Sequence, residues 1–153
     1  MPRRYLALAP AVVLIFTACS GAGSTASPSS PAPSPSAAAG AAVHRIEVKL
    51  NDSLKMDPSE MSVKAGQAVT FVVTNAGAID HEFYLGDEGM QAEQEQMMQS
   101  GQMAHDTAQS ISLKPGETRE LTYTFDTVGQ TIAGCHVSGH YAAGMKATIT
   151  VTS

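Results

Sequence analysis

The chain of 153 residues has only two cysteines, no cluster of lysines and arginines, and no apolar run long enough to span a membrane. A transmembrane helix needs about 20 apolar residues, and the apolar stretch at residues 5–16 is too short. The lack of a basic cluster argues against nucleic acid as a partner. The length allows one ordinary domain plus appendages.

Residues 1–18 have the order of a signal peptide, because two arginines precede the apolar stretch and small residues follow it. The small residues stand directly before Cys19, which resembles a bacterial lipobox, where the signal is cut and Cys19 receives the lipid. Phe16 stands where leucine is commoner, so secretion without lipid is the alternative. Either route places the rest of the chain outside the cytoplasm, and the lipid would anchor it to the membrane.

Residues 19–42 form the expected tether that follows the signal peptide. Beyond the lipidated Cys19, this segment has four prolines, no charge and no large apolar side chain. It cannot bury enough surface to offset the entropy lost on ordering, so we expect disorder. The folded domain is then residues 43–153, which we expect to be a monomer. Loss of the two signal-peptide arginines leaves seven basic and 14 acidic residues, a net charge of −7.

Short strand patterns fill most of the domain. Alternating or β-branched apolar residues predict strands within segments 46–50, 61–75, 81–86, 111–125, 130–135 and 146–152. Two of these segments contain a glycine turn and hold two strands each. The prediction is an all-β fold, an antiparallel sandwich or Greek-key barrel of seven to eight strands.

Segment 87–106 breaks this pattern, since it is rich in Gln, Glu, Ala and Met and has no β-branched residue. It predicts a short helix over residues 88–99, inserted between strands. Met90, Met97 and Met98 fall on one helical face. This spacing favours a packing role against the sandwich, because methionine is an adaptable core filler.

The stretch 134–145, GCHVSGHYAAGM, places one thiol, two imidazoles and one thioether within twelve residues. Cys135 ends a predicted strand, and His140 and Met145 follow at intervals of five residues, just before the last strand. A loop of this length can fold the three side chains around one point. Thiolate and thioether are soft ligands for Cu(I), and imidazole suits both oxidation states of copper.

Two histidines and one cysteine with a long axial methionine form the blue-copper arrangement, which here needs a second imidazole. His81, at the start of the strand 81–86, offers it. Zinc also accepts Cys and His, but methionine is a poor zinc ligand. A metal would also account for Cys135, because a lipidated Cys19 leaves it without a disulfide partner. A Cys19–Cys135 disulfide is the alternative.

These motifs resemble the cupredoxin family. The resemblance rests on VKAGQAVTFVVTN followed by HEF, on LKPGET, and on Cys-x₄-His-x₄-Met before the last strand. The ending MAHD of the Met-rich segment and GHYAAGMKA are similar to a bacterial subgroup of small secreted cupredoxins. The resemblance covers nearly all of residues 43–153. It implies one type 1 copper per chain, with His81, Cys135 and His140 equatorial and Met145 axial, and no bond-making catalysis.

His136 departs from the simplest version of this site. The stretch CHVSGHYAAGM also resembles the type 1 site of multicopper oxidases, where histidines on both sides of the cysteine reach a trinuclear cluster. Gly134 takes the preceding position here, and five histidines are too few for such a cluster. We expect His136 to point outward; its functional alternative is an electron exit. We expect His140 near the surface, beside a small apolar patch for a redox partner: Gly139, Tyr141, Ala142 and Ala143.

Two functional hypotheses follow. The first is one-electron transfer with an unidentified redox partner by a type 1 copper protein tethered outside the cytoplasm. The second is a copper-binding or resistance lipoprotein that buffers or delivers copper through the Met-rich insertion. There a second site would prefer Cu(I), and its candidate ligands are Met90, Met97, Met98, Met103 and His105. A metal-free interaction module is a third interpretation, which leaves Cys135 without a role.

Overall fold

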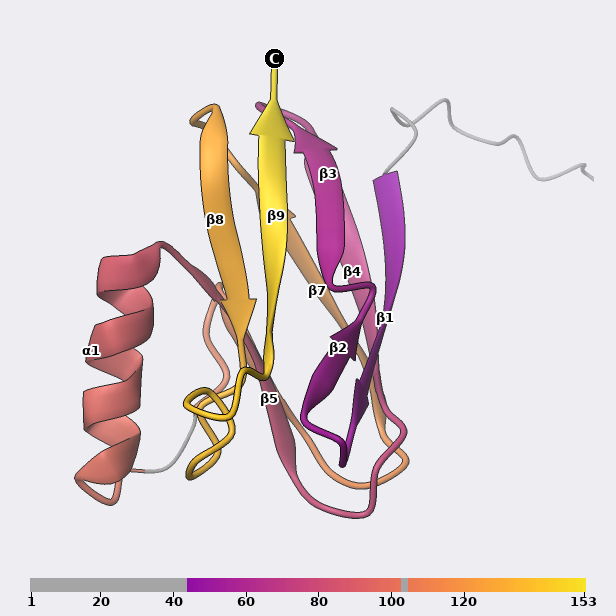
Figure 1. Cartoon of the computed structure of the whole chain (residues 1–153). Coiled ribbons are helices and arrows are strands. Elements are labelled where there is room, and N and C mark those ends of the chain that lie inside the picture. The colour runs from indigo at the N-terminus through magenta and orange to yellow at the C-terminus, as the bar shows by residue number, and fades with distance from the viewer. Residues whose placement is uncertain (1–43, 103–104) are drawn as a thin grey trace, which may run out of the picture. The chain divides into compact units, whose positions relative to one another are not determined.

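The computed structural model describes residues 44–102 and 105–153, which form nine strands and one helix (Figure 1). In chain order the elements are β1 (His44–Asn51), β2 (Lys55–Asp57), β3 (Glu60–Lys64), β4 (Ala68–Asn75), β5 (His81–Gly86), α1 (Glu88–Gln99), β6 (Ser110–Leu113), β7 (Thr118–Thr124), β8 (Gly129–Gly134) and β9 (Lys146–Thr152). The ninth strand, β2, is the one that the sequence patterns miss, because three residues are too few to establish an alternation.

The strands form two sheets, with the orders β2-β1-β4-β7 and β3-β9-β8-β5-β6. Figure 1 shows β8 and β9 in one layer and β4 and β7 in the other, with α1 outside β8. The prediction of a two-sheet β-sandwich is confirmed. Neither sheet is wholly antiparallel, however, because β1 pairs in parallel with β4, and β3 with β9. The chain visits the opposite sheet between the two members of each pair, so no hairpin fixes an antiparallel pairing.

The helix begins and ends at the predicted residues. Asp87 caps its first turn, because the side-chain oxygen of Asp87 accepts the backbone N–H of Met90 at 2.9 Å. Within residues 44–102 and 105–153, no helix has the length and apolar character that crossing a membrane requires.

The core fills the space between the sheets and extends to the end where β8 and β9 meet their connecting loop. The rings of Phe71 and Phe83 are 5.3 Å apart at its centre. Apolar residues of β9 alternate inward, as half-buried strands require. Cys135 and Met145 belong to the same cluster, and each is fully buried. Two of the candidate ligands therefore lie within the packed apolar core.

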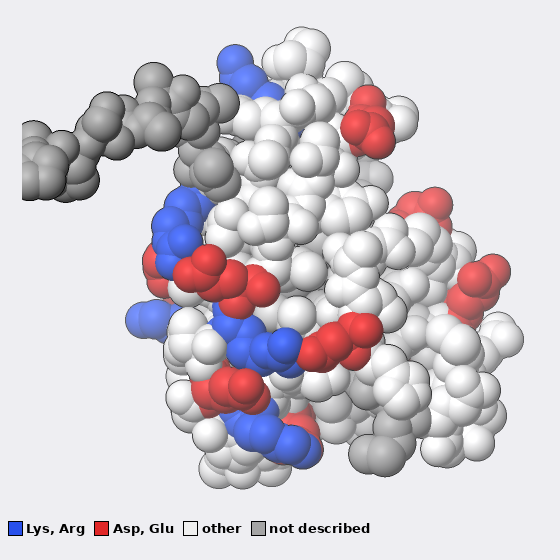
Figure 2. Space-filling view, turned by 180° about the vertical axis from the view of Figure 1, so that it is seen from behind, with Lys and Arg blue, Asp and Glu red and all other residues white. Residues whose placement is uncertain are grey.

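The charged side chains of the domain are mixed. Figure 2 shows acidic and basic side chains next to one another, without a broad patch of one sign on that face. Ion pairs contribute to this mixing; Arg45 on β1, for example, lies 2.7 Å from Glu120 on β7. The face shown offers no basic surface of the kind that nucleic-acid binding requires.

Candidate metal centre

The loop between β8 and β9 presents three of the four expected ligands. Cys135 follows the last residue of β8, and Met145 precedes the first residue of β9. The backbone N–H of Cys135 donates to the carbonyl of Met145 at 3.1 Å, and that of Met145 donates to the carbonyl of His140 at 3.0 Å. Backbone hydrogen bonds within the loop thus fix its conformation, and with it the Cα positions of the three ligand residues.

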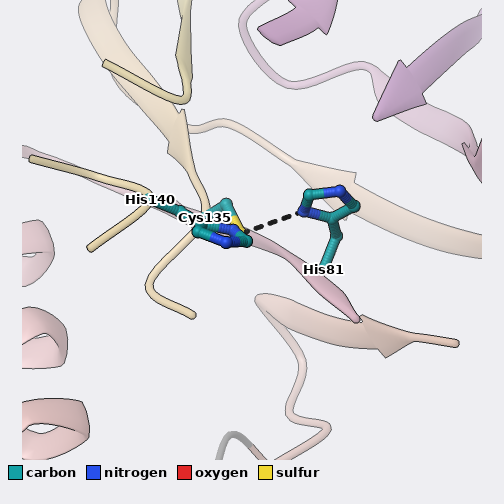
Figure 3. A group of neighbouring side chains, drawn as sticks. All are labelled: His81, Cys135 and His140. Atoms are coloured by element: carbon teal, nitrogen blue, oxygen red, sulfur yellow. Dashed lines mark hydrogen bonds between the residues drawn. The ribbon is translucent and has the colours of Figure 1, made fainter. Parts of the chain in front are cut away.

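The fourth expected ligand, His81, enters from β5. Figure 3 shows its ring facing the sulfur of Cys135, with His140 beside the cysteine. The Cys135 Sγ lies 3.8 Å from Nδ1 of His81 and 3.4 Å from Nδ1 of His140. One ligand atom from each of the three residues lies within 4.8 Å of the others. The three donors converge on one point, and the side chain of Met145 is fully buried in the core that adjoins them.

The donor set fits copper. Burial lowers the pKa of His81 and of His140, so both imidazoles are neutral and offer a lone pair at neutral pH. Burial also raises the pKa of the Cys135 thiol to about 11, so the thiolate requires a bound cation for its stability. Cys135 is free of disulfides in the part of the chain that the structure describes. One thiolate, two imidazoles and a thioether are the ligands of a type 1 copper centre.

The outer nitrogen of His81 points to a carboxylate that the sequence analysis did not single out. Nε2 of His81 lies 3.5 Å from Oδ1 of Asp52, which is too long for a formed hydrogen bond but close enough for electrostatic attraction. Asp52 is held in place because the backbone N–H of Ala78 donates to its Oδ2 at 2.7 Å, and this bond lowers the pKa of Asp52. The carboxylate therefore favours the tautomer of His81 that leaves Nδ1 free for copper.

The structure places His136 inside the protein, so the expectation that it points outward is wrong. His136 is fully buried beneath α1. Its Nε2 lies 2.7 Å from the side-chain oxygen of Gln91, and its Nδ1 lies 2.9 Å from Glu95. The amide nitrogen of Gln91 donates to backbone carbonyls of β5 and β8, including Ile132 at 2.9 Å, which fixes the orientation of the amide. A role of His136 as an electron exit stays a prediction.

The buried carboxylate of Glu82 connects the two segments that bear the ligands. Its side chain accepts the backbone N–H of His136 at 3.2 Å and the amide of Gln94 at 3.0 Å. Its own backbone N–H donates to the Cys135 sulfur at 3.3 Å. Burial raises the pKa of Glu82 from 4.5 to about 7. No sequence motif marks Glu82, because a strand residue next to a ligand carries no distinct pattern.

The space around residue 134 explains why a glycine occupies this position. A Cβ at this position would lie 2.3 Å from the side-chain oxygen of Gln91 and 2.9 Å from the ring of Tyr141. Any larger residue before Cys135 would therefore force the side chains of Gln91 and Tyr141 to move.

The predicted packing of α1 through its methionines holds only in part, because Met90 and Met98 are half-buried whereas Met97 is exposed. The buried residues of α1 are Gln91 and Gln94, whereas Met97 is 42% exposed. Met90 lines a cavity beside β7 and β8, apart from the one lined by Met97, Met98 and His105. The remaining member of the predicted set, Met103, lies outside the described residues, as do Cys19, the signal peptide 1–18 and the tether.

His140 and its neighbours in the sequence lie near the surface, as expected, and a docking patch formed by them stays a prediction. His140 is 7% exposed, compared with 1% for His81 and 0% for Cys135. Of the predicted patch, Tyr141 is half-buried and the other residues are exposed: Gly139, Ala142 and Ala143. His140 is thus the ligand that lies nearest to solvent.

Comparison with known proteins gives a consistent result. Residues 42–152 match the family of copper binding proteins described as plastocyanin/azurin. The copper-resistant cuproprotein CopI of Pseudomonas aeruginosa is 35% identical over 98% of this chain and 98% of its own length. Dithionite-reduced auracyanin from Roseiflexus castenholzii has a TM-score of 0.64 and 25% identity, covering 71% of this chain and 97% of its own.

Auracyanin A of Chloroflexus aurantiacus, described as a "blue" copper protein, has a TM-score of 0.61 and 27% identity, over 71% of this chain and 98% of its own. The sandwich, the buried centre of His81, Cys135, His140 and Met145, and these matches all agree. This chain belongs to the plastocyanin/azurin family of copper-binding proteins.

Proposed function

We propose that this protein carries single electrons through a type 1 copper centre outside the cytoplasm. The observation that carries the proposal is the convergence of the Cys135 sulfur and two neutral imidazoles within 4.8 Å at the end of the core. Bound copper would supply the change between Cu(II) and Cu(I).

The chain's own contribution is to keep the ligands in place. The loop that bears Cys135, His140 and Met145 is closed by backbone hydrogen bonds, and the side chains are buried. Contacts of this kind resist rearrangement when the charge of the centre changes. The structure is therefore suited to electron exchange with little movement of the ligands.

Electrons would pass through the edge of the centre that lies nearest to solvent. His140 is that edge, and its sequence neighbours Gly139, Ala142 and Ala143 are small and exposed. A redox partner protein with an apolar docking surface could approach here without displacing bulky groups.

The N-terminal sequence supports a location outside the cytoplasm. Residues 1–18 have the pattern of a signal peptide, and Cys19 follows small residues as a lipidated cysteine does. The proposed form is a monomer tethered by residues 19–42 to a membrane surface. Mass spectrometry of the mature N-terminus tests the lipid, because diacylglyceryl addition changes the mass of the first peptide.

The proposed centre is tested by adding Cu(II) to the purified protein and measuring visible absorption and copper content. An intense thiolate-to-copper band that grows until one Cu(II) is bound, and bleaches on reduction, is the expected result. Rapid electron exchange with a small inorganic oxidant should follow. Copper bound without this band would mean that Cys135 is not an equatorial ligand, and electron transfer would be abandoned.

A second candidate function is copper resistance by binding and buffering the metal. It is favoured by the 35% identity to a protein named as a copper-resistant cuproprotein, over nearly the full length of both chains. Deletion of the gene from its host should lower copper tolerance if this function applies. Restoration of tolerance by a variant with Cys135 replaced would show that resistance does not depend on the type 1 centre.

A further inference from the structure

Two thioethers and an imidazole meet at a second place in the fold. Met97 and Met98, near the end of α1, line a cavity of about 130 Å³ together with His105, in the segment that leads to β6. The other lining residues are neutral: Tyr84, Gln94, Gln102, Thr107 and Ser110. No residue of this cavity is a ligand of the type 1 centre.

These methionines are not required to hold the helix against the sandwich. The buried face of α1 consists of Gln91 and Gln94, which form hydrogen bonds to the strands and to Glu82. Met97 leaves 42% of its surface exposed, and Met98 is half-buried. A large apolar side chain at an exposed position gains little from burial, so packing does not explain it.

His105 is held at the cavity by its backbone, while its ring is free. The hydroxyl of Ser110 donates to the carbonyl of His105 at 2.7 Å. The next residue, Asp106, accepts the backbone N–H of Ser112 at 3.0 Å and lies 2.6 Å from Arg119. Among residues 44–102 and 105–153, the His105 imidazole has no hydrogen-bond partner. An exposed ring on an anchored backbone is available to bind a ligand.

We propose that Met97, Met98 and His105 form a second copper site that is selective for Cu(I). Thioether sulfur is a soft donor that favours Cu(I), and imidazole accepts the same ion. The set contains no carboxylate or thiolate, so it offers little to Zn²⁺ or to Cu(II). This assignment rests on the second candidate function, copper buffering, and is independent of electron transfer at the type 1 centre.

The second site would lie next to the first. Met98 also lines a neighbouring cavity of about 330 Å³, whose walls include the ligand His81 and Val137. Met98 therefore lines both the cavity of the proposed site and the cavity next to His81. Met90 lines a different cavity, beside Tyr123 and Phe125, and so does not belong to the proposed site.

The test is an anaerobic titration of the purified protein with Cu(I) in competition with a chromophoric Cu(I) chelator. The Cys135→Ser variant is used first, because it removes the strongest ligand of the type 1 centre. It should still withdraw one Cu(I) from the chelator. The double variant Met97→Leu/Met98→Leu in the same background should lose this binding, since leucine keeps the apolar volume but has no sulfur donor. His105→Ala should lose it as well.

Met90→Leu serves as the matched control, because it removes a methionine from the same helix but not from the cavity. It should keep the bound Cu(I). Circular dichroism of each variant checks that α1 is intact. If Cys135→Ser binds no Cu(I), or if Met97→Leu/Met98→Leu binds as tightly as its parent, the proposed site is wrong.

Failure of this proposal is distinguishable from failure of the type 1 assignment. With Cys135 intact, Met97→Leu/Met98→Leu should show the same thiolate-to-copper band as the unaltered protein and should bind one copper instead of two. X-ray absorption of the Cu(I) bound to Cys135→Ser should show two sulfur neighbours and one nitrogen. A Cu(I) ion with only nitrogen and oxygen neighbours would overturn the assignment.

Discussion

The side-chain oxygen of Gln91 lies 2.7 Å from Nε2 of His136, so a residue of the inserted helix binds directly to the neighbour of the copper ligand Cys135. The same helix reaches the neighbour of His81, because Gln94 donates to Glu82. The insertion is thus attached to both ligand-bearing segments through buried polar contacts. Breaking such a contact is strongly unfavourable in free energy, because it leaves an unpaired polar group in the interior.

The contact between Gln91 and His136 should make Gln91→Leu destabilising. Leucine has a similar size but leaves Nε2 of His136 without an acceptor, which should lower the free energy of unfolding by about 2 kcal/mol. Urea unfolding of the copper-free protein measures the change. Gln96→Leu, at an exposed position of the same helix, is the control and should have little effect. Equal stability of the two variants would contradict this prediction.

Gly134→Ala should destabilise the protein because of a steric conflict with Gln91 and Tyr141. Shortening Gln91 to alanine relieves one of these two contacts. The destabilisation by Gly134→Ala should therefore be smaller in the Gln91→Ala background than in the unaltered protein. Thermal unfolding of the four proteins in this cycle gives the interaction free energy, and strictly additive effects would refute the contact.

Cys135→Ser should abolish the intense visible band of the copper-loaded protein. A hydroxyl is a poor copper ligand and cannot supply the thiolate-to-copper transition. The absorption spectrum after addition of one equivalent of Cu(II) measures the effect. A retained band would show that another group provides the thiolate, and the assignment of the centre would fail.

Met145→Leu should keep copper bound and raise the reduction potential. The side chain of Met145 is fully buried, and leucine fills a similar volume without a sulfur donor. Loss of a donor disfavours Cu(II) relative to Cu(I), and the potential of type 1 centres depends on the axial ligand. Voltammetry measures the potential; an unchanged value would mean that Met145 is not a ligand.

Glu82→Gln should change how stability depends on pH. Burial raises the pKa of Glu82 from 4.5 to about 7, so the folded protein binds this proton more tightly than the unfolded chain. The resulting stability is fully present below pH 4.5 and is lost as the pH rises toward 7. Glutamine does not titrate, so the variant should gain stability relative to the parent over this range.

The change in pKa limits the gain in the free energy of unfolding of Glu82→Gln to about 3 kcal/mol. Urea unfolding of both copper-free proteins at pH 4.5 and pH 8 measures it. The buried histidines contribute to both proteins and cancel in the difference. A difference in the free energy of unfolding that is the same at both pH values would contradict the prediction.

Much of the fold follows from local sequence. The helix is predicted from the local composition of residues 88–99, and the longer strands are predicted from alternation along the chain. The short strand β2 and the parallel strand pairings are not predicted, because they depend on how the strands are distributed between the two sheets. Three of the copper ligands share one loop, so their spacing reveals them.

Only the tertiary structure determines which elements cover the two faces of β8 and of the loop that follows it. Alternation along β8 and its loop directs Cys135 into the core and His136 to the opposite face. From the sequence, that face is expected to be exposed to solvent. The sandwich instead places α1 over that side, so His136 is buried and requires polar partners. The helix therefore turns Gln91 and Gln94 inward and leaves Met97 exposed, because hydrogen bonding to buried polar groups outweighs the burial of thioethers there.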